Sequence, residues 1–217
     1  MDSQKLLEKF AESKSVTNDL FELKINDDYS IQVYPNSINQ LNDVTFFIGK
    51  EGIDKFLFLL TANSNTATLT SFEGKFVAET NGTSLKKCAL SNKNRIALQK
   101  LFSFTVPQVL GIHDSFGFGD RLGLANGGHI RSLAIGNFKP ILAQQSIREL
   151  TRTQRTAGEV MDAAVLAVFQ EGYKNGFGSD ADHLKTPDDS TIMLNAGFTM
   201  FTFDPGEHVD NKADNYD

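Results

Sequence analysis

The stretch FTMFTFDPGEHVDN, residues 198–211, joins a strand-forming run to a cluster of reactive side chains. Its first six residues are aromatic, β-branched or apolar, which favours a β-strand. Asp204, Glu207 and His208 follow directly, together with a Pro-Gly turn. In sheets built of parallel strands, ligands bind where the strands end at their carboxyl side. The stretch therefore predicts a parallel strand that delivers residues to a site.

The same pattern occurs three more times between residues 105 and 197. Apolar runs that end in polar residues are VLGIH (109–113), ILAQQ (141–145) and GFGSDADH (176–183). Helical patterns cover residues 122–133, 147–150, 158–173 and 187–196, the last followed by Gly197 at the usual helix-ending position. Strands that alternate with helices in repeats of roughly 30 residues predict parallel βα units. Four units make about half of a (β/α)8 barrel, and a small doubly wound sheet is the alternative.

Residues 1–104 have a different texture and predict a small α+β module with antiparallel strands. An amphipathic pattern with Leu6, Leu7 and Phe10 comes first, and a helix with Ser91 as its N-cap is expected over residues 91–101. Between them lie the strand-like runs DLFELKI, YSIQVYP, DVTFFIG, KFLFLLT, ATLTSFEG and KFVAET, separated by turn-forming residues. No motif that carries chemistry is present here. The α/β region at 105–217 is therefore the expected catalytic part.

Composition excludes several classes of protein. The 217 residues carry a net charge of −6, whereas a general nucleic-acid binder needs a basic face. There is one cysteine, Cys88, which cannot form an intramolecular disulfide and which we assign to packing. No apolar run reaches the ~20 residues that span a bilayer, and no basic start precedes an apolar segment. We expect a soluble cytoplasmic protein that acts on a small molecule. The chain also has no GxSxG motif, which disfavours acyl-transfer hydrolysis.

Three of the four histidines follow predicted strands and are candidate metal ligands. They are His113, His183 and His208, each with a carboxylate close in sequence. Imidazole and carboxylate groups gathered at the mouth of one barrel are suitable ligands for a divalent cation. Hydrogen-bonded loop histidines are the ordinary alternative.

Three basic residues at the same kind of position are candidate partners for a substrate carboxylate. Arg121 lies in the glycine-spaced loop GIHDSFGFGDRLG (111–123), Arg148 follows the second predicted strand and Lys185 follows the third. A surface ion pair, a solvated basic helix face and a turn cap are the respective alternatives. The loop matches neither the dinucleotide fingerprint nor a phosphate-binding Walker loop.

Several long runs resemble the tagaturonate/fructuronate epimerase family of bacterial hexuronate catabolism. The runs are SFGFGDRLGLA, AQQSIRELTRT, VFQEGYKNGFGSDADHLKT and FDPGEHVDN, and the resemblance covers roughly residues 106–217. It implies a TIM-barrel-like enzyme, a divalent metal and epimerisation of a keto-hexuronate. Members of the family are about twice as long. We therefore expect this chain to be an N-terminal portion, inactive alone and completed by a missing C-terminal half or by a homo-oligomer.

The two sugar acids of that family differ at a carbinol that the ketone does not acidify, so simple enolisation cannot invert it. A retro-aldol/aldol route can, and it needs a base, an acid and a Lewis acid. We assign Asp114 or Asp120 as the base and Glu207 as the acid. The alternatives are another metal-dependent aldolase or isomerase of sugar acids, or a fragment that only binds substrate or a partner half.

Overall fold

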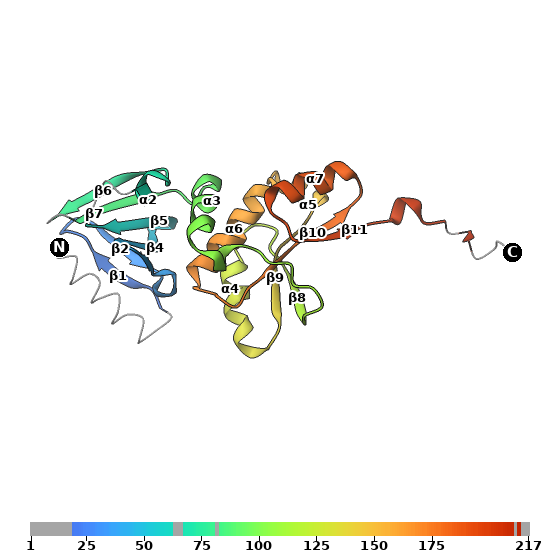
Figure 1. Ribbon diagram of the computed structural model, residues 1–217, viewed down its shortest axis with the longest axis horizontal. Helices are drawn as coiled ribbons and strands as arrows, with labels where there is room; N and C mark the ends of the chain where they lie inside the picture. Colours follow the sequence, from blue (N-terminus) through green and yellow to red (C-terminus); the bar gives the residue numbers. More distant parts are fainter. Residues whose placement is uncertain (1–18, 63–66, 81–82, 211, 214–217) are drawn as a thin grey trace.

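A computed structural model describes residues 19–62, 67–80, 83–210 and 212–213. The described chain is mixed α/β and contains two sheets, one antiparallel and one parallel. In Figure 1, helices α3 and α6 lie between the two sheets. None of the described helices is both long enough and apolar enough to span a membrane.

The antiparallel sheet has the order β1-β2-β4-β5-β7-β6, with β3 paired to β4. Its strands are β1 (Phe21–Lys24), β2 (Ser30–Val33), β3 (Asn39–Leu41), β4 (Val44–Glu51), β5 (Asp54–Thr61), β6 (Gly74–Thr80) and β7 (Thr83–Cys88). The β4–β5 hairpin turns at Gly52, whose φ of 59° is the left-handed conformation that glycine adopts without strain. A short 3-10 segment, η1 (Pro35–Ser37), leads into β3.

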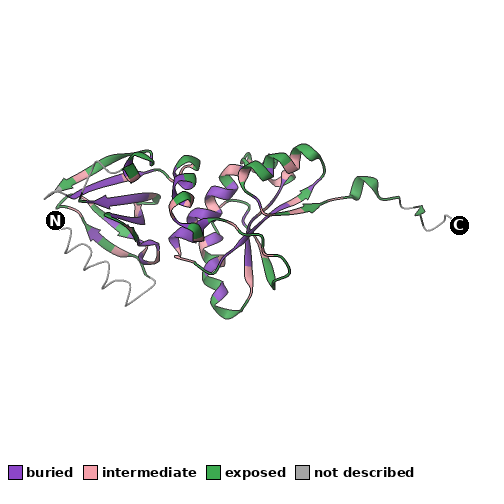
Figure 2. Ribbon diagram, in the orientation of Figure 1, coloured by how far each residue is buried: buried purple, intermediate pink, exposed green. Residues whose placement is uncertain are grey.

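The central strands β4 and β5 are largely buried on both faces, as their purple colour in Figure 2 shows. One face carries Phe47 and Phe58, whose rings stack at 5.2 Å. The other packs Phe46 edge-on against Phe102, close to α3 (Asn92–Leu101) and to Phe169 of α6 (Ala157–Gln170). The heavy use of phenylalanine thus supplies the core between the sheet and the helices.

One prediction for this region was wrong, two strands were missed, and one predicted helix lies outside the described residues. The run ATLT forms the short helix α2 (Ala67–Thr70) instead of a strand, and β3 and β7 were not predicted. The helix expected around Leu6, Leu7 and Phe10 falls among residues that the structure does not describe. The helix expected over 91–101 is confirmed as α3, with Ser91 as its N-cap.

The parallel sheet contains β8 (Ser115–Gly119), β9 (Lys139–Ser146), β10 (Gly178–Leu184) and β11 (Met200–Phe203). These strands pair in strict chain order, β8-β9-β10-β11, and every pair is parallel. The connecting helices are α4 (Asn126–Ser132), α5 (Ile147–Thr153), α6 and α7 (Pro187–Ala196), with 3-10 segments η2 (Ser103–Thr105), η3 (Leu133–Ile135) and η4 (Gly206–His208). All four helices contribute to one apolar cluster with β9 and β10.

Local sequence fixes the ends of these helices. Helices α5, α6 and α7 each begin with a complete capping box, at Ser146, Thr156 and Thr186. Such a box satisfies two backbone donors that a helix N-terminus otherwise leaves free. Helix α7 ends at Gly197 with φ 95°, as its sequence predicted.

The first predicted strand of this sheet was wrong in position. Residues 109–113 form no strand, because Gly111 takes φ 60° and the amide of His113 bonds to the carbonyl of Leu110, closing a turn. The strand starts two residues later, at Ser115. The helix predicted over 122–133 likewise begins only at Asn126.

Candidate active site at the carboxyl edge of the parallel sheet

The parallel sheet brings most of the predicted site residues to one edge. Asp120 and Arg121 follow β8, and Arg148 follows β9 in the first turn of α5. At the other two strands the residues are His183 at the end of β10, Lys185 just beyond it, and Glu207 and His208 after β11. Because the strands are parallel, these positions share the carboxyl edge.

His113 and Asp114 lie at the opposite edge, which corrects their assignment. Both precede β8, and the carbonyl of Asp114 accepts a 2.8 Å bond from the amide of Lys139, the first residue of β9. The error follows from the misplaced first strand. Asp114 is therefore separated from the carboxyl edge by the length of β8, and it no longer serves as the candidate base.

A polar row that the sequence reasoning missed crosses the sheet beside this edge. Thr202 of β11 donates to Oδ1 of Asp180 at 2.9 Å, and Gln144 of β9 donates to Oδ2 at 3.3 Å. Asp180 is only 2% exposed. Burial raises its pKa, and repulsion from Asp182 adds to this, while the two hydrogen bonds act in the opposite direction.

The space for this row depends on Gly117 of β8. A Cβ at position 117 would lie 2.7 Å from Oε1 of Gln144, so any side chain would push Gln144 away from Asp180. The alternation of Asp180 and Asp182 in GSDADH places both on one face of β10 and was the available sequence signal.

His183 is held in a strained conformation at the end of β10. Its φ is 54°, which is uncommon for a residue other than glycine and is concentrated at functional sites. Nδ1 of His183 lies 2.8 Å from Oδ1 of Asp182. A carboxylate on Nδ1 orients the ring and leaves Nε2 as the nitrogen available to a ligand.

Lys185 and Glu207 form an ion pair across the edge. Nζ of Lys185 donates to Oε1 of Glu207 at 2.6 Å. This hydrogen bond and the attraction of the charges raise the pKa of Lys185 and lower the pKa of Glu207. The charge of Arg148 acts on the pKa of Lys185 in the opposite direction. Glu207 is therefore a carboxylate at neutral pH, which suits a base better than the predicted acid.

Arg121 and Asp120 are engaged in holding the loop after β8. Arg121 donates through Nε and Nη2 to Oε1 of Glu149, at 3.0 and 2.5 Å. The carboxylate of Asp120 accepts from the amides of three consecutive residues, 124 to 126, at 2.8 to 3.0 Å. Asp120 is only 7% exposed, so it fits a structural role better than that of a base.

Comparison with known proteins decides the family. The model of the UxaE family, described as tagaturonate epimerase, matches residues 34–217. The chain belongs to this family. It is 42% identical over 182 residues to the tagaturonate/fructuronate epimerase of Thermotoga maritima, covering 84% of this chain and 37% of that protein.

Solved structures of the family agree with the fold. A glycerol complex of the fructuronate-tagaturonate epimerase UxaE from Cohnella laeviribosi matches with a TM-score of 0.78 and 36% identity, over 99% of this chain and 39% of that one. The native structure of the same enzyme matches with a TM-score of 0.77 and 40% identity, over 86% of this chain and 37% of that one. The chain thus spans about two fifths or less of the length of these epimerases.

The predicted metal ligands do not form a complete site among the described residues of this family member. No three His, Cys, Asp or Glu side chains of the described ranges come close enough to hold one ion. His183, oriented by Asp182, has the arrangement of a single ligand. His208 lies in η4 beyond β11, and His113 is at the other edge.

Proposed function

We propose that this protein serves the interconversion of D-tagaturonate and D-fructuronate, with the carboxyl edge of its parallel sheet as the substrate site. The observation that carries the proposal is the gathering of Lys185, Glu207 and the Asp182–His183 pair at this edge in a member of the epimerase family. The relatives named above carry both sugar acids in their names.

We further propose that the parallel sheet is part of a (β/α) barrel. A doubly wound sheet reverses its strand order at a switch point, and no reversal occurs among β8, β9, β10 and β11. The helices share one apolar cluster on one face, while Gln144 and Asp180 meet as a polar row. One helical face and one inner face are what a barrel requires.

Lys185 and Arg148 are the proposed partners of the substrate carboxylate. Arg121 is the third candidate, although Glu149 already accepts two of its hydrogen bonds. The pKa of Glu149 is lowered: burial opposes ionisation, but bonds from Arg121 and Ser146 outweigh it. An anionic substrate would therefore displace Glu207 from Lys185 more easily than Glu149 from Arg121, since the side chain of Glu207 is 71% exposed and that of Glu149 22%.

Glu207 is the proposed base of a retro-aldol/aldol route. It would remove the proton from the substrate hydroxyl, after which the carbon–carbon bond breaks, the aldehyde fragment turns and the bond re-forms on its other face. A divalent cation, with His183 and His208 as the ligands this chain offers, would stabilise the enediolate when bound. Because the described residues do not complete its site, no step is assigned to the ion.

The test is an epimerisation assay with D-tagaturonate and added Mn, Ni, Zn or Co, with products separated by chromatography. We expect Glu207→Gln to lower turnover by about 100-fold or more, the usual contribution of a general base. Glu22→Gln, an exposed change in β1, should leave turnover unchanged. If the chain turns nothing over, binding of D-tagaturonate is measured with Lys185→Met as the comparison. A folded chain that neither converts nor binds this sugar acid contradicts the proposal.

A further inference from the structure

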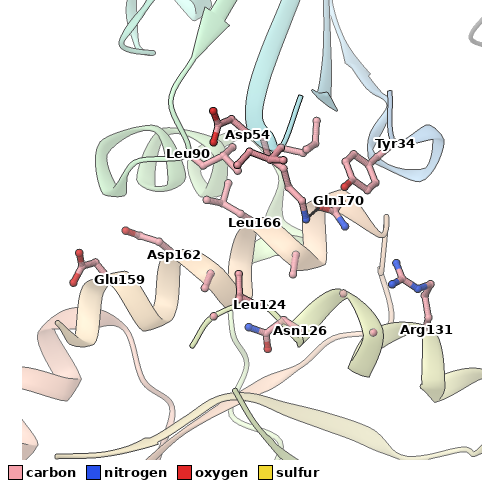
Figure 3. A pocket seen from close by; sticks show the side chains of 18 residues that line it. Tyr34, Asp54, Leu90, Leu124, Asn126, Arg131, Glu159, Asp162, Leu166 and Gln170 are labelled. Carbon is pink, nitrogen blue, oxygen red and sulfur yellow. Dashed lines mark hydrogen bonds between the residues drawn. The ribbon is translucent and has the colours of Figure 1, made fainter. Parts of the chain in front are cut away.

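A cavity lies between the antiparallel sheet and the helices α4 and α6, and its lining also includes Gly123 and Leu124 of the loop after β8. Its volume is about 480 Å³, which is within the range of small-molecule sites. Figure 3 shows α6 running along it, with Asp162, Leu166 and Gln170 on the side that faces the cavity. We call this cavity the inter-sheet cleft.

One end of the inter-sheet cleft carries two cations that belong to different layers. Lys55 comes from β5 of the antiparallel sheet, and Arg131 from α4. Arg131 donates to Glu171 at 2.7 Å. Nζ of Lys55 donates to the neutral Oε1 of Gln170 at 2.8 Å and lies 5.1 Å from the centre of the Tyr34 ring. Within the described part of the chain, no carboxylate forms an ion pair with Lys55.

The electrostatics of this end favour an added anion. Burial lowers the pKa of Lys55; the attraction of Glu171 opposes this, and the positive charge of Arg131 adds a smaller lowering. A bound oxyanion would relieve both the desolvation and the repulsion, because it would stand between two cations. At this end two cations meet one carboxylate, that of Glu171. The cleft is also lined by the carboxylates of Asp54, Glu159 and Asp162, of which Asp162 is already paired with Arg95.

A buried amide in the same cleft points to a ligand that also carries hydroxyl groups. Asn126 is only 3% exposed and lines the cleft. Its Oδ1 is buried and has no hydrogen-bond partner among the described residues. Leaving a buried acceptor unpaired is costly, and a hydroxyl donor would remove that cost. Tyr34, whose pKa burial raises, keeps its own hydroxyl proton for donation to the anion.

We propose that the inter-sheet cleft binds a small hydroxy acid, with its anionic group between Lys55 and Arg131 and a hydroxyl directed to Asn126. The cationic end of this site is distinct from the carboxyl edge. Gln170, beside the cationic end, is the last residue of α6, whereas the first residue of α6 follows α5 at the carboxyl edge. The 14 residues of α6 separate the two by about 20 Å. A ligand held there would tie the antiparallel sheet to α4.

The test is isothermal titration calorimetry with D-glucuronate as the probe and D-glucose and inorganic phosphate as comparators. The double variant Lys55→Met/Arg131→Met removes the cationic end. Lys75→Met/Arg152→Met removes the same charge from exposed positions outside the cleft. We expect the first to weaken glucuronate binding about tenfold or more and the second to bind like the wild type. Lys185→Met distinguishes the two sites, because it weakens only binding that takes place at the carboxyl edge.

Three results would overturn the proposal. Unchanged glucuronate affinity in the Lys55→Met/Arg131→Met variant would remove the cleft as the site. Loss of binding in Lys185→Met alone would assign the binding to the carboxyl edge. Binding of phosphate without glucuronate, or of neither, would rule out a hydroxy acid. The single Lys55→Met variant keeps the Arg131–Glu171 bond and replaces the double variant if circular dichroism shows that the latter is unfolded. Failure of the epimerisation assay does not bear on these outcomes.

Discussion

A buried ion pair joins helices α3 and α6, and its removal should strongly destabilise the protein. Nε of Arg95 in α3 donates to Oδ1 of Asp162 in α6 at 2.8 Å, and Nδ2 of Asn92 donates to the same oxygen at 3.1 Å. The side chains of the pair are 8% and 11% exposed. Asp162→Ala would leave the Arg95 charge buried, with Gln99 at 2.7 Å as its one remaining side-chain partner among the described residues.

The expected cost follows from this burial. Breaking a buried pair by removing one partner costs about 3–5 kcal/mol, because the remaining charge stays desolvated. For a chain of this size, each kcal/mol lowers the melting temperature by about 2–4 °C. Asp162→Ala should therefore lower the melting temperature by roughly 6–20 °C and shift urea unfolding, followed by circular dichroism, by the same free energy.

The chain offers a matched control and a rescue. Lys93 of α3 forms a second ion pair, with Glu73 just before β6, but the two side chains are 65% and 62% exposed. Glu73→Ala should cost no more than about 1 kcal/mol. Replacing both buried partners, as Arg95→Met/Asp162→Leu, should recover most of the loss, since no charge is then left buried. If Asp162→Ala costs no more than Glu73→Ala, the argument that burial gives this pair its weight is refuted.

Two further predictions concern a glycine and a titration. Gly172→Ala should lower the free energy of unfolding in urea by more than about 1 kcal/mol, because φ is 61° and a Cβ would lie 2.3 Å from the carbonyl oxygen of Asn36. Gly52→Ala is the control, since Gly52 has nearly the same φ but open space around it. An equal loss in both variants would contradict the steric explanation. Lys185→Met should raise the pKa of Glu207 toward the ordinary glutamate value of about 4.3, since the cation is what lowers it; an unmoved carboxyl midpoint in an NMR titration would show that Lys185 does not act on Glu207.

The parts of the fold that the sequence predicted well are those with their own local signals. Helix α7 was placed at both ends because Pro187 begins it and Gly197 follows its last residue. Strand β8 was missed for the opposite reason. SFGFG contains two glycines, which have low β propensity, while the apolar run before it, VLGIH, looks like a buried strand and is a turn at Gly111.

The sequence could predict that the site lies at the carboxyl edge of the parallel sheet, but not which side chains contact each other there. The rule that polar residues at parallel strand ends meet was enough to gather Lys185 and Glu207. The bonds of Asp180 to Gln144 and Thr202 depend on the register of three strands. Register shifts occur on both sides of β10, so no spacing in the sequence could supply these partners.

The pairing of opposite charges at the carboxyl edge suggests how substrate binding and proton removal are connected. Glu207 and Lys185 are 71% and 46% exposed, and exposed ion pairs in water are weak enough to be exchanged. We infer that an incoming sugar carboxylate replaces Glu207 as the partner of Lys185. Glu207 then loses the contact that lowers its pKa, so it becomes a stronger base at the moment the substrate arrives. Lys185→Met should therefore raise KM far more than it lowers kcat, and an equal effect on both would contradict the exchange.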